Sequence, residues 1–129
     1  MGAVRLLLVD DEEILLDLLG KYLERLGYEV HTCATAAAAL VRFDNDPKGY
    51  ALVLTDLTLP GMKGDAMLEQ MRTLNPSLRA ILTSGYPYVP QSDYVSFLQK
   101  PFLPKVLAAE IRQRLALPEV RSQKSEDRS

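Results

Sequence analysis

Short strand-like runs alternate with segments of helical periodicity along most of this chain. The run Leu6-Leu7-Leu8-Val9 is apolar at consecutive positions, as in a strand that is covered on both faces. Further strands are predicted at residues 28–33, 51–55, 79–83 and 96–99. This alternation, with short connections, predicts an α/β fold in which helices cover both faces of a parallel sheet through right-handed crossovers.

Four segments between or after these runs favour helices. In the first, apolar residues recur at helical spacing: Ile14, Leu15, Leu18, Leu19, Tyr22, Leu23 and Leu26. Gly27 suits the end of this helix, and Thr35 suits the N-cap of a second helix that runs through Phe43. A third helix is marked by Met67 to Leu74 and ends before Pro76, and the last runs from Leu103 to Leu115.

Size and composition bound the possible functions. The chain has 129 residues, which suits one domain with one core, and we expect residues 1–117 to form it and residues 118–129 to be a disordered tail or linker. A net charge of −2, from 15 basic and 17 acidic residues, argues against nucleic-acid binding. No apolar run approaches the ~20 residues of a membrane span, so we expect a cytoplasmic protein without membrane contact. The single Cys33 fits a reducing compartment and a buried apolar role.

Polar residues follow four of the predicted strands at the point where each strand stops. They are Asp10-Asp11, Asp56, Thr83-Ser84-Gly85 and Lys100-Pro101. In an open parallel sheet, the crevice at the carboxyl ends of the strands is where ligands bind. Three carboxylates brought together there repel one another and favour a bound cation. Hard oxygen donors without histidine or thiolate suit Mg²⁺, which typically takes one or two protein carboxylates together with a substrate phosphate.

A metal at this edge would hold a phosphoryl donor against a carboxylate nucleophile. Carboxylates form covalent acyl phosphates, and Asp56 is the best placed nucleophile because it ends the predicted middle strand. Lys100 supplies a positive charge for the phosphoryl oxygens, and Ser84 supplies a hydroxyl donor.

These segments together resemble the receiver domain of two-component response regulators, over about residues 5 to 117. The matching stretches are Asp10-Asp11, Leu52 to Gly61 around Asp56, Thr83-Ser84-Gly85-Tyr86, and Phe97-Leu98-Gln99-Lys100-Pro101-Phe102. The last two stretches are most similar to the corresponding stretches in receivers of hybrid sensor histidine kinases. The resemblance implies a flavodoxin-like (CheY-like) doubly wound sheet of five parallel strands in the order 2-1-3-4-5.

The resemblance also implies a role for each matching position. Asp56 matches the phosphorylated aspartate and a metal ligand, Asp11 the direct Mg²⁺ ligand, and Asp10 the acid that reaches the metal through water. Thr58 matches the residue whose backbone carbonyl binds the metal. Ser84 and Lys100 match the groups that hold the phosphoryl oxygens, and Ser84 and Phe97 the pair that switches conformation. Pro101 matches a proline whose preceding peptide bond is often cis.

The implied partner is a sensor histidine kinase or a histidine phosphotransfer protein. Such a module takes a phosphoryl group from the partner's phosphohistidine, later hydrolyses it, and is no metabolic enzyme. No output domain is recognisable after Leu117, so we expect a single-domain regulator or a receiver from a hybrid kinase.

One segment departs from the family pattern. The stretch between Ser84 and Lys100 is shorter than the family normally uses for a full fourth helix, and it contains Pro87 and Pro90 without a helical stripe. We therefore expect a shortened or missing fourth helix. Tyr86, Tyr88 and Tyr94 lie on this stretch, where they would form an exposed aromatic patch for a partner. His31 has no paired ligand and is interpreted as a residue at the solvent edge of the second strand.

Two other functions stay open at this point. The first is an interaction module with the receiver fold that works without phosphorylation, which the reduced fourth-helix segment favours. The second is an aspartyl-phosphate phosphohydrolase of the haloacid dehalogenase type with Asp10 as nucleophile, although Glu12 stands where such an enzyme would have an aspartate. Phosphorylation of Asp56 by acetyl phosphate would separate the receiver from both.

Overall fold

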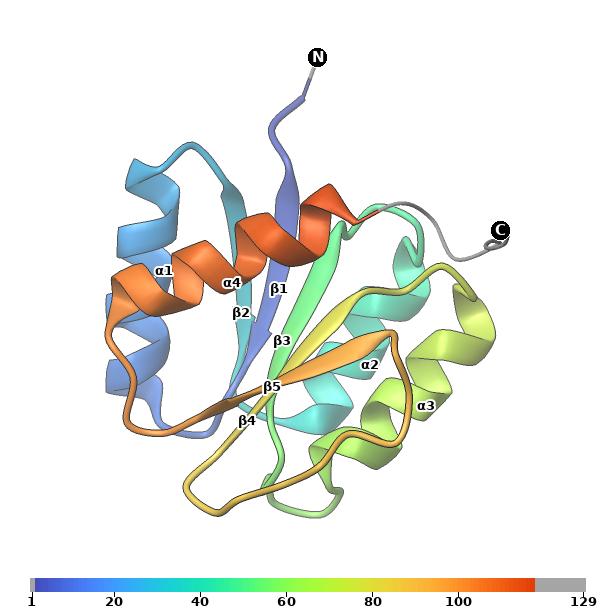
Figure 1. Ribbon diagram of the computed structural model, residues 1–129. Helices are drawn as coiled ribbons and strands as arrows, with labels where there is room; N and C mark the ends of the chain where they lie inside the picture. The colour runs from blue at the N-terminus through green and yellow to red at the C-terminus, as the bar shows by residue number, and fades with distance from the viewer. Residues whose placement is uncertain (1, 118–129) are drawn as a thin grey trace, which may run out of the picture.

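A computed structural model describes residues 2–117. Nine elements follow one another along the chain: β1 (Arg5–Val9), α1 (Glu13–Arg25), β2 (Glu29–Cys33), α2 (Ala36–Asn45), β3 (Leu52–Asp56), α3 (Gly64–Leu74), β4 (Ala80–Ser84), β5 (Val95–Gln99) and α4 (Pro104–Ala116). The strands form one sheet in the order β2-β1-β3-β4-β5, and all neighbouring strands are parallel (Figure 1). The predicted fold class and strand order are confirmed.

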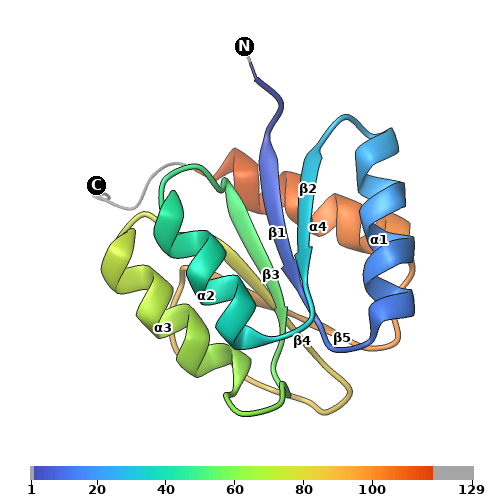
Figure 2. The ribbon, with the colours of Figure 1, turned by 180° about the vertical axis from the view of Figure 1, so that it is seen from behind.

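The sheet has a helical layer on each face. Figures 1 and 2 show α1 and α4 on one face and α2 and α3 on the other. Alternate residues of β1 serve the two layers: Leu6 and Leu8 pack with the core under α1 and α4, whereas Leu7 and Val9 pack with the core under α2 and α3. This double coverage explains why β1, β3 and β4 each contain apolar residues at consecutive positions, since both faces of each strand are buried.

Two of the predicted helix signals act as expected. The Thr35 hydroxyl accepts a hydrogen bond from the Ala38 N–H at 3.1 Å, which caps α2. Gly27 follows α1 with φ +102°, a left-handed conformation that glycine adopts without a steric penalty.

The buried face of α1 differs from the predicted apolar stripe. The helix buries Leu16, Leu19, Gly20 and Leu23, whereas Ile14 is 88% exposed and Leu18 55% exposed. α1 carries apolar side chains around more of its circumference than the sheet can cover, so periodicity alone does not identify the face that packs. Ile14 and Leu18, which belong to the apolar residues at helical spacing in the sequence, therefore lie outside the buried face.

The crossover from β4 to β5 contains no helix. Residues 85–94 run as an irregular segment, and the helix labelled α4 follows β5. Pro87 and Pro90 and the short connection explain this, because proline removes a helical hydrogen bond and clashes with the preceding turn. The prediction that the fourth crossover helix is shortened or missing is confirmed.

The tyrosines of this segment do not form an exposed patch together. Tyr86 is 74% exposed, Tyr88 is half-buried, and Tyr94 is 8% exposed. Tyr94 is buried because it packs into the core beneath α2 and α3, so the prediction was wrong for this residue.

The predicted tail, residues 118–129, lies outside the described residues, and its disorder stays a prediction. No helix within residues 2–117 is long and apolar enough to cross a bilayer.

Candidate functional site: an acidic cluster at the carboxyl edge of the sheet

The parallel sheet places the predicted site residues at one edge. Asp10 follows β1, Asp56 is the last residue of β3, Ser84 is the last residue of β4, and Lys100 follows β5. The Lys100 N–H donates to the Ser84 carbonyl oxygen at 2.8 Å, which continues the ladder between β4 and β5 and sets the height of Lys100 at the edge. Residues that are up to 90 positions apart therefore meet.

Three carboxylates form the centre of the site. Asp10, Asp11 and Asp56 each place a carboxylate oxygen within 4.8 Å of the others. Asp10 and Asp56 are buried, at 6% and 9% exposure, whereas Asp11 is exposed to solvent. The set offers only hard oxygen donors, so it is compatible with a Mg²⁺ site.

Lys100 supplies the counter-charge. Its Nζ lies 2.8 Å from an Asp10 oxygen, 2.8 Å from a Glu12 oxygen and 3.5 Å from an Asp56 oxygen. Burial by itself lowers the pKa of this ammonium, but its hydrogen bonds to Asp10 and Glu12 outweigh burial and leave the pKa raised. Lys100 is therefore charged at any physiological pH.

The pKa of Asp56 is raised above its usual value. Burial is the main cause, the Lys100 ammonium opposes it, and the negative charge of Asp10 adds to it. A backbone hydrogen bond from Thr58 favours the ionised form. Asp56 is thus a carboxylate that folding has taken out of water and placed beside a like charge.

The remaining predicted residues lie close to this centre. Ser84 is 1% exposed, and its hydroxyl oxygen accepts a hydrogen bond from the Tyr86 N–H at 3.0 Å. Phe97 is half-buried on β5 and contacts the ring of Tyr88, with centroids 6.0 Å apart. The peptide bond between Lys100 and Pro101 is cis.

Two neighbours of the acidic cluster were not predicted from the sequence. Glu12 pairs with Lys100, and its only signal was that it follows Asp10-Asp11. Gly64 begins α3 and donates its N–H to the Leu57 carbonyl oxygen at 2.7 Å, and a Cβ at this position would overlap the Asp56 carbonyl oxygen. A glycine directly before a helical stripe was the available signal for this close approach.

His31 and Cys33 lie on the edge strand β2, where the Cys33 carbonyl oxygen accepts a hydrogen bond from the Asp10 N–H at 3.1 Å. The His31 ring nitrogens hydrogen-bond the Tyr50 hydroxyl at 2.6 Å and the Glu29 carboxylate at 2.9 Å. Cys33 is buried and free, and burial raises the pKa of its thiol. Neither side chain is part of the acidic cluster.

Comparison with known proteins agrees with this geometry. The sequence model of the response regulator receiver domain matches residues 6–112, so the chain belongs to this family, whose members are signalling domains of two-component systems. The response regulator receiver protein CpdR of Brucella abortus (strain 2308) is 32% identical over 117 residues, which cover 86% of this chain and 96% of that protein. The sensor kinase CckA of the same organism is 30% identical over 120 residues, and these span 88% of this chain but 13% of that kinase.

Solved structures show the same architecture. The receiver domain of the hybrid histidine kinase CckA superposes with a TM-score of 0.79 at 30% identity, covering 86% of this chain and 98% of that domain. The response regulator protein TrrA of Thermotoga maritima, solved in complex with Mg²⁺ and BeF, superposes with a TM-score of 0.75 at 28% identity, covering 86% and 98%. Both are similar to this chain in fold and over nearly its whole length.

Proposed function

We propose that this domain accepts a phosphoryl group onto Asp56 from the phosphohistidine of a partner, with Mg²⁺, as a step in a two-component phosphorelay. The observation that carries the proposal is the meeting of three carboxylates and the Lys100 ammonium at one sheet edge in a chain of the receiver family. The partner would be a sensor histidine kinase or a histidine phosphotransfer protein. The domain then acts as a signalling module.

In the transfer, an Asp56 carboxylate oxygen attacks the phosphorus atom of the partner's phosphohistidine. A P–O bond forms and the P–N bond breaks, and its electron pair stays on the imidazole nitrogen, which binds a proton. Water later attacks the phosphorus of the acyl phosphate and returns Asp56 and inorganic phosphate. The raised pKa of Asp56 supports this role, because a more basic and less solvated carboxylate is a better nucleophile.

The residues present fit a magnesium ion. Asp11 and Asp56 would bind it directly, Asp10 through a water molecule, and Thr58 through its backbone carbonyl. When bound, Mg²⁺ supplies positive charge that offsets the charge of the phosphoryl oxygens and of the carboxylates. The mutual repulsion of three carboxylates within 4.8 Å favours such an ion.

Lys100 would pair with a phosphoryl oxygen. In the structure its ammonium lies nearer to Asp10 and Glu12 than to Asp56. An incoming phosphoryl group on Asp56 competes with these two acids for the same ammonium. Glu12, whose side chain is the more exposed of the two, is the partner that we expect Lys100 to release.

Ser84 and Phe97 would carry the switch. The Ser84 hydroxyl is held by the Tyr86 N–H, so a movement of Ser84 toward the phosphoryl group pulls on residues 85–94. Phe97 contacts Tyr88 of the same segment, so a change of its side-chain rotamer reaches this segment by a second route. Without a crossover helix, the surface change falls on an irregular segment. Backbone amide shifts with and without BeF₃⁻ test this, and shifts confined to the pocket would contradict it.

The phosphorylation site is tested by incubation with acetyl phosphate and Mg²⁺, followed by intact-mass measurement. We expect one phosphoryl adduct on the wild type, none on Asp56→Ala, and an undiminished adduct on Asp44→Ala, which removes an exposed aspartate from α2. EDTA should prevent the adduct. A wild-type protein without any adduct would instead favour the phosphorylation-independent interaction module.

The phosphohydrolase alternative is separated by a different measurement. Turnover of small phosphate esters that is lost in Asp10→Asn but kept in Asp56→Asn would favour it over the receiver function. We expect no such turnover.

A further inference from the structure

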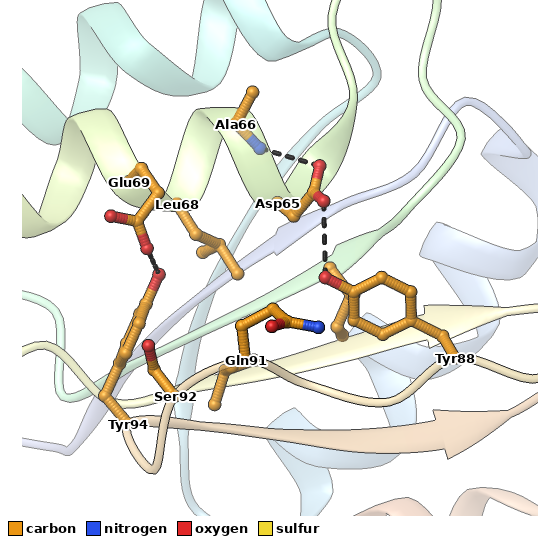
Figure 3. A pocket seen from close by; sticks show the side chains of 10 residues that line it. Asp65, Ala66, Leu68, Glu69, Tyr88, Gln91, Ser92 and Tyr94 are labelled. Carbon is orange, nitrogen blue, oxygen red and sulfur yellow. Dashed lines mark hydrogen bonds between the residues drawn. The ribbon is translucent and has the colours of Figure 1, made fainter.

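The missing crossover helix leaves a groove on the face that carries α2 and α3. A cavity of about 420 Å³ lies between α3 and residues 88–95, beside β4 and β5. Figure 3 shows Asp65, Ala66 and Glu69 along one wall and Tyr88, Gln91, Ser92 and Tyr94 along the other. Every other crossover of this sheet packs a helix on the sheet, so this is the one covered by an irregular segment among the described residues.

The groove has an apolar floor with polar walls. Leu68, Leu82 and Val95 form the floor. The Tyr88 hydroxyl donates to an Asp65 oxygen at 3.2 Å, and the Tyr94 hydroxyl donates to a Glu69 oxygen at 2.7 Å (Figure 3). These two bonds tie the irregular segment to α3 across the groove.

The charged side chains that line the groove are all acidic. Asp65 and Glu69 are the charged residues among the ten that line it, and no lysine or arginine is among them. Within residues 2–117 neither acid forms an ion pair. The Arg72 guanidinium lies beside the groove, over the ring of Tyr94, but pairs with neither acid. An apolar partner that covered this groove would take both carboxylates out of water without an ion-pair partner, which costs free energy unless the partner brings a cation.

We infer that this groove is a docking site for an apolar segment of a partner protein that inserts an arginine side chain between Asp65 and Glu69. Arginine fits better than lysine because its planar guanidinium pairs with carboxylates through several N–H groups and stacks on aromatic rings. The Arg72 guanidinium lies 4.5 Å from the ring centroid of Tyr94 and already covers that ring, so the incoming guanidinium would pair with the two carboxylates. Tyr86 and Val89, which are 74% and 77% exposed, extend the apolar surface along the same segment.

This site differs from the acidic cluster and does not require phosphorylation of Asp56. The docking test is therefore made on the unphosphorylated chain with saturating Mg²⁺, so that the carboxylates of the metal site are occupied and do not compete for the probe.

The probes are three short peptides with the same leucine and tyrosine residues, carrying arginine, lysine or glutamine at the charged positions. Binding is followed by backbone amide shifts in ¹⁵N-labelled protein and by titration. We expect the arginine peptide to shift the amides of Ala66, Glu69 and Ser92. The lysine peptide should bind more weakly, and the glutamine peptide more weakly still.

Three variants test whether the peptide binds in the groove. Glu69→Gln keeps an acceptor for Tyr94 but removes the charge, and should weaken the arginine peptide about threefold, as for a partly exposed ion pair. Ala66→Trp changes an exposed position of α3 and fills the groove, so it should abolish binding. Glu24→Gln removes an exposed acid of α1 and should change nothing.

Three results would overturn the inference. They are equal binding of the arginine and glutamine peptides, unchanged binding by Ala66→Trp, and shifts centred on Asp10 and Asp56 in place of the groove. An arginine peptide that binds nowhere would also overturn it.

Discussion

Replacement of Asp56 by asparagine should make the metal-free protein more stable at neutral pH. Asp56 is 9% exposed and shares the sheet edge with Asp10 and Asp11. Asparagine keeps the shape and one acceptor oxygen but carries no charge. A buried charge that is kept for chemistry lowers stability, so the asparagine variant should have a higher free energy of unfolding.

The magnitude follows from opposing contributions. At an effective dielectric constant of about 20, like charges 4.8 Å apart repel by about 3.5 kcal/mol, and opposite charges 3.5 Å apart attract by about 4.7 kcal/mol. The first distance is the limit for Asp10 and Asp56, and the second joins Asp56 to Lys100. Since Asp11 is exposed and adds a little repulsion, the pairwise interactions nearly cancel.

Burial of the Asp56 charge is then the deciding contribution. A buried ion costs several kcal/mol after relaxation, and a buried amide costs about 1–3 kcal/mol. We therefore expect Asp56→Asn to raise the free energy of unfolding by about 1–2 kcal/mol, or the melting temperature by about 4 °C per kcal/mol for a domain of this size.

The gain should depend on pH in a defined direction. Because the folded-state pKa of Asp56 is raised, the folded protein binds this proton more tightly than the unfolded chain, so the wild type loses stability as pH rises from the ordinary value of 3.8 through the folded pKa. Asp56→Asn lacks this loss. The difference between the two proteins should be full at pH 7 and vanish as pH falls toward 3.8.

Urea unfolding followed by far-UV circular dichroism in EDTA measures both effects, and the absence of tryptophan makes this a better probe than fluorescence. Asp44→Asn on the exposed side of α2 is the matched control and should stay within about 0.5 kcal/mol of the wild type. A variant that is no more stable than the wild type at pH 7, or a gain that does not change with pH, would refute the reasoning.

Three further substitutions should lower the free energy of unfolding, and the structure gives the reason for each. Lys100→Ala leaves two buried carboxylates without their counter-charge and should cost about 2–4 kcal/mol in EDTA, with Mg²⁺ restoring part of it in a thermal melt; an equally stable variant would show that Lys100 does not balance them. Gly64→Ala places a methyl group on the Asp56 carbonyl oxygen and should cost about 1–3 kcal/mol in urea unfolding, whereas Gly85→Ala, with open space around it, serves as the tolerated control. Tyr94→Phe removes the hydroxyl that donates to Glu69 at 2.7 Å and should cost about 1 kcal/mol, more than Tyr88→Phe, whose bond to Asp65 is longer; the reverse order would contradict this account of the groove.

Features that depend on residues close together in the chain were predicted correctly, whereas features that depend on packing between distant elements were not. The capping hydroxyl of Thr35 and the terminating Gly27 act within one or two helical turns, and both were predicted correctly. The buried face of α1 was not, because Leu16 and Ile14 are equally apolar and only the position of the neighbouring sheet decides which of them is covered. Tyr94 was placed on the surface for the same reason.

The acidic cluster shows the same division. Asp10, Asp56 and Lys100 are recognisable in the chain because each stands where an apolar strand stops, and parallel strands bring such ends to one edge. That Lys100 pairs with Glu12 as well as Asp10, and that α3 approaches Asp56 so closely that only glycine fits at position 64, follow from how the loops close over that edge.

By itself, the amino-acid sequence determined the alternation of strands and helices, the order of the polar strand ends and the loss of one crossover helix, since each depends on residues close together in the chain. Only the tertiary structure decided which apolar faces are buried, which acids bind Lys100, and that a groove remains beside α3 with two carboxylates that form no ion pair within residues 2–117. These depend on distances between elements far apart in the chain, which are set by packing against the sheet.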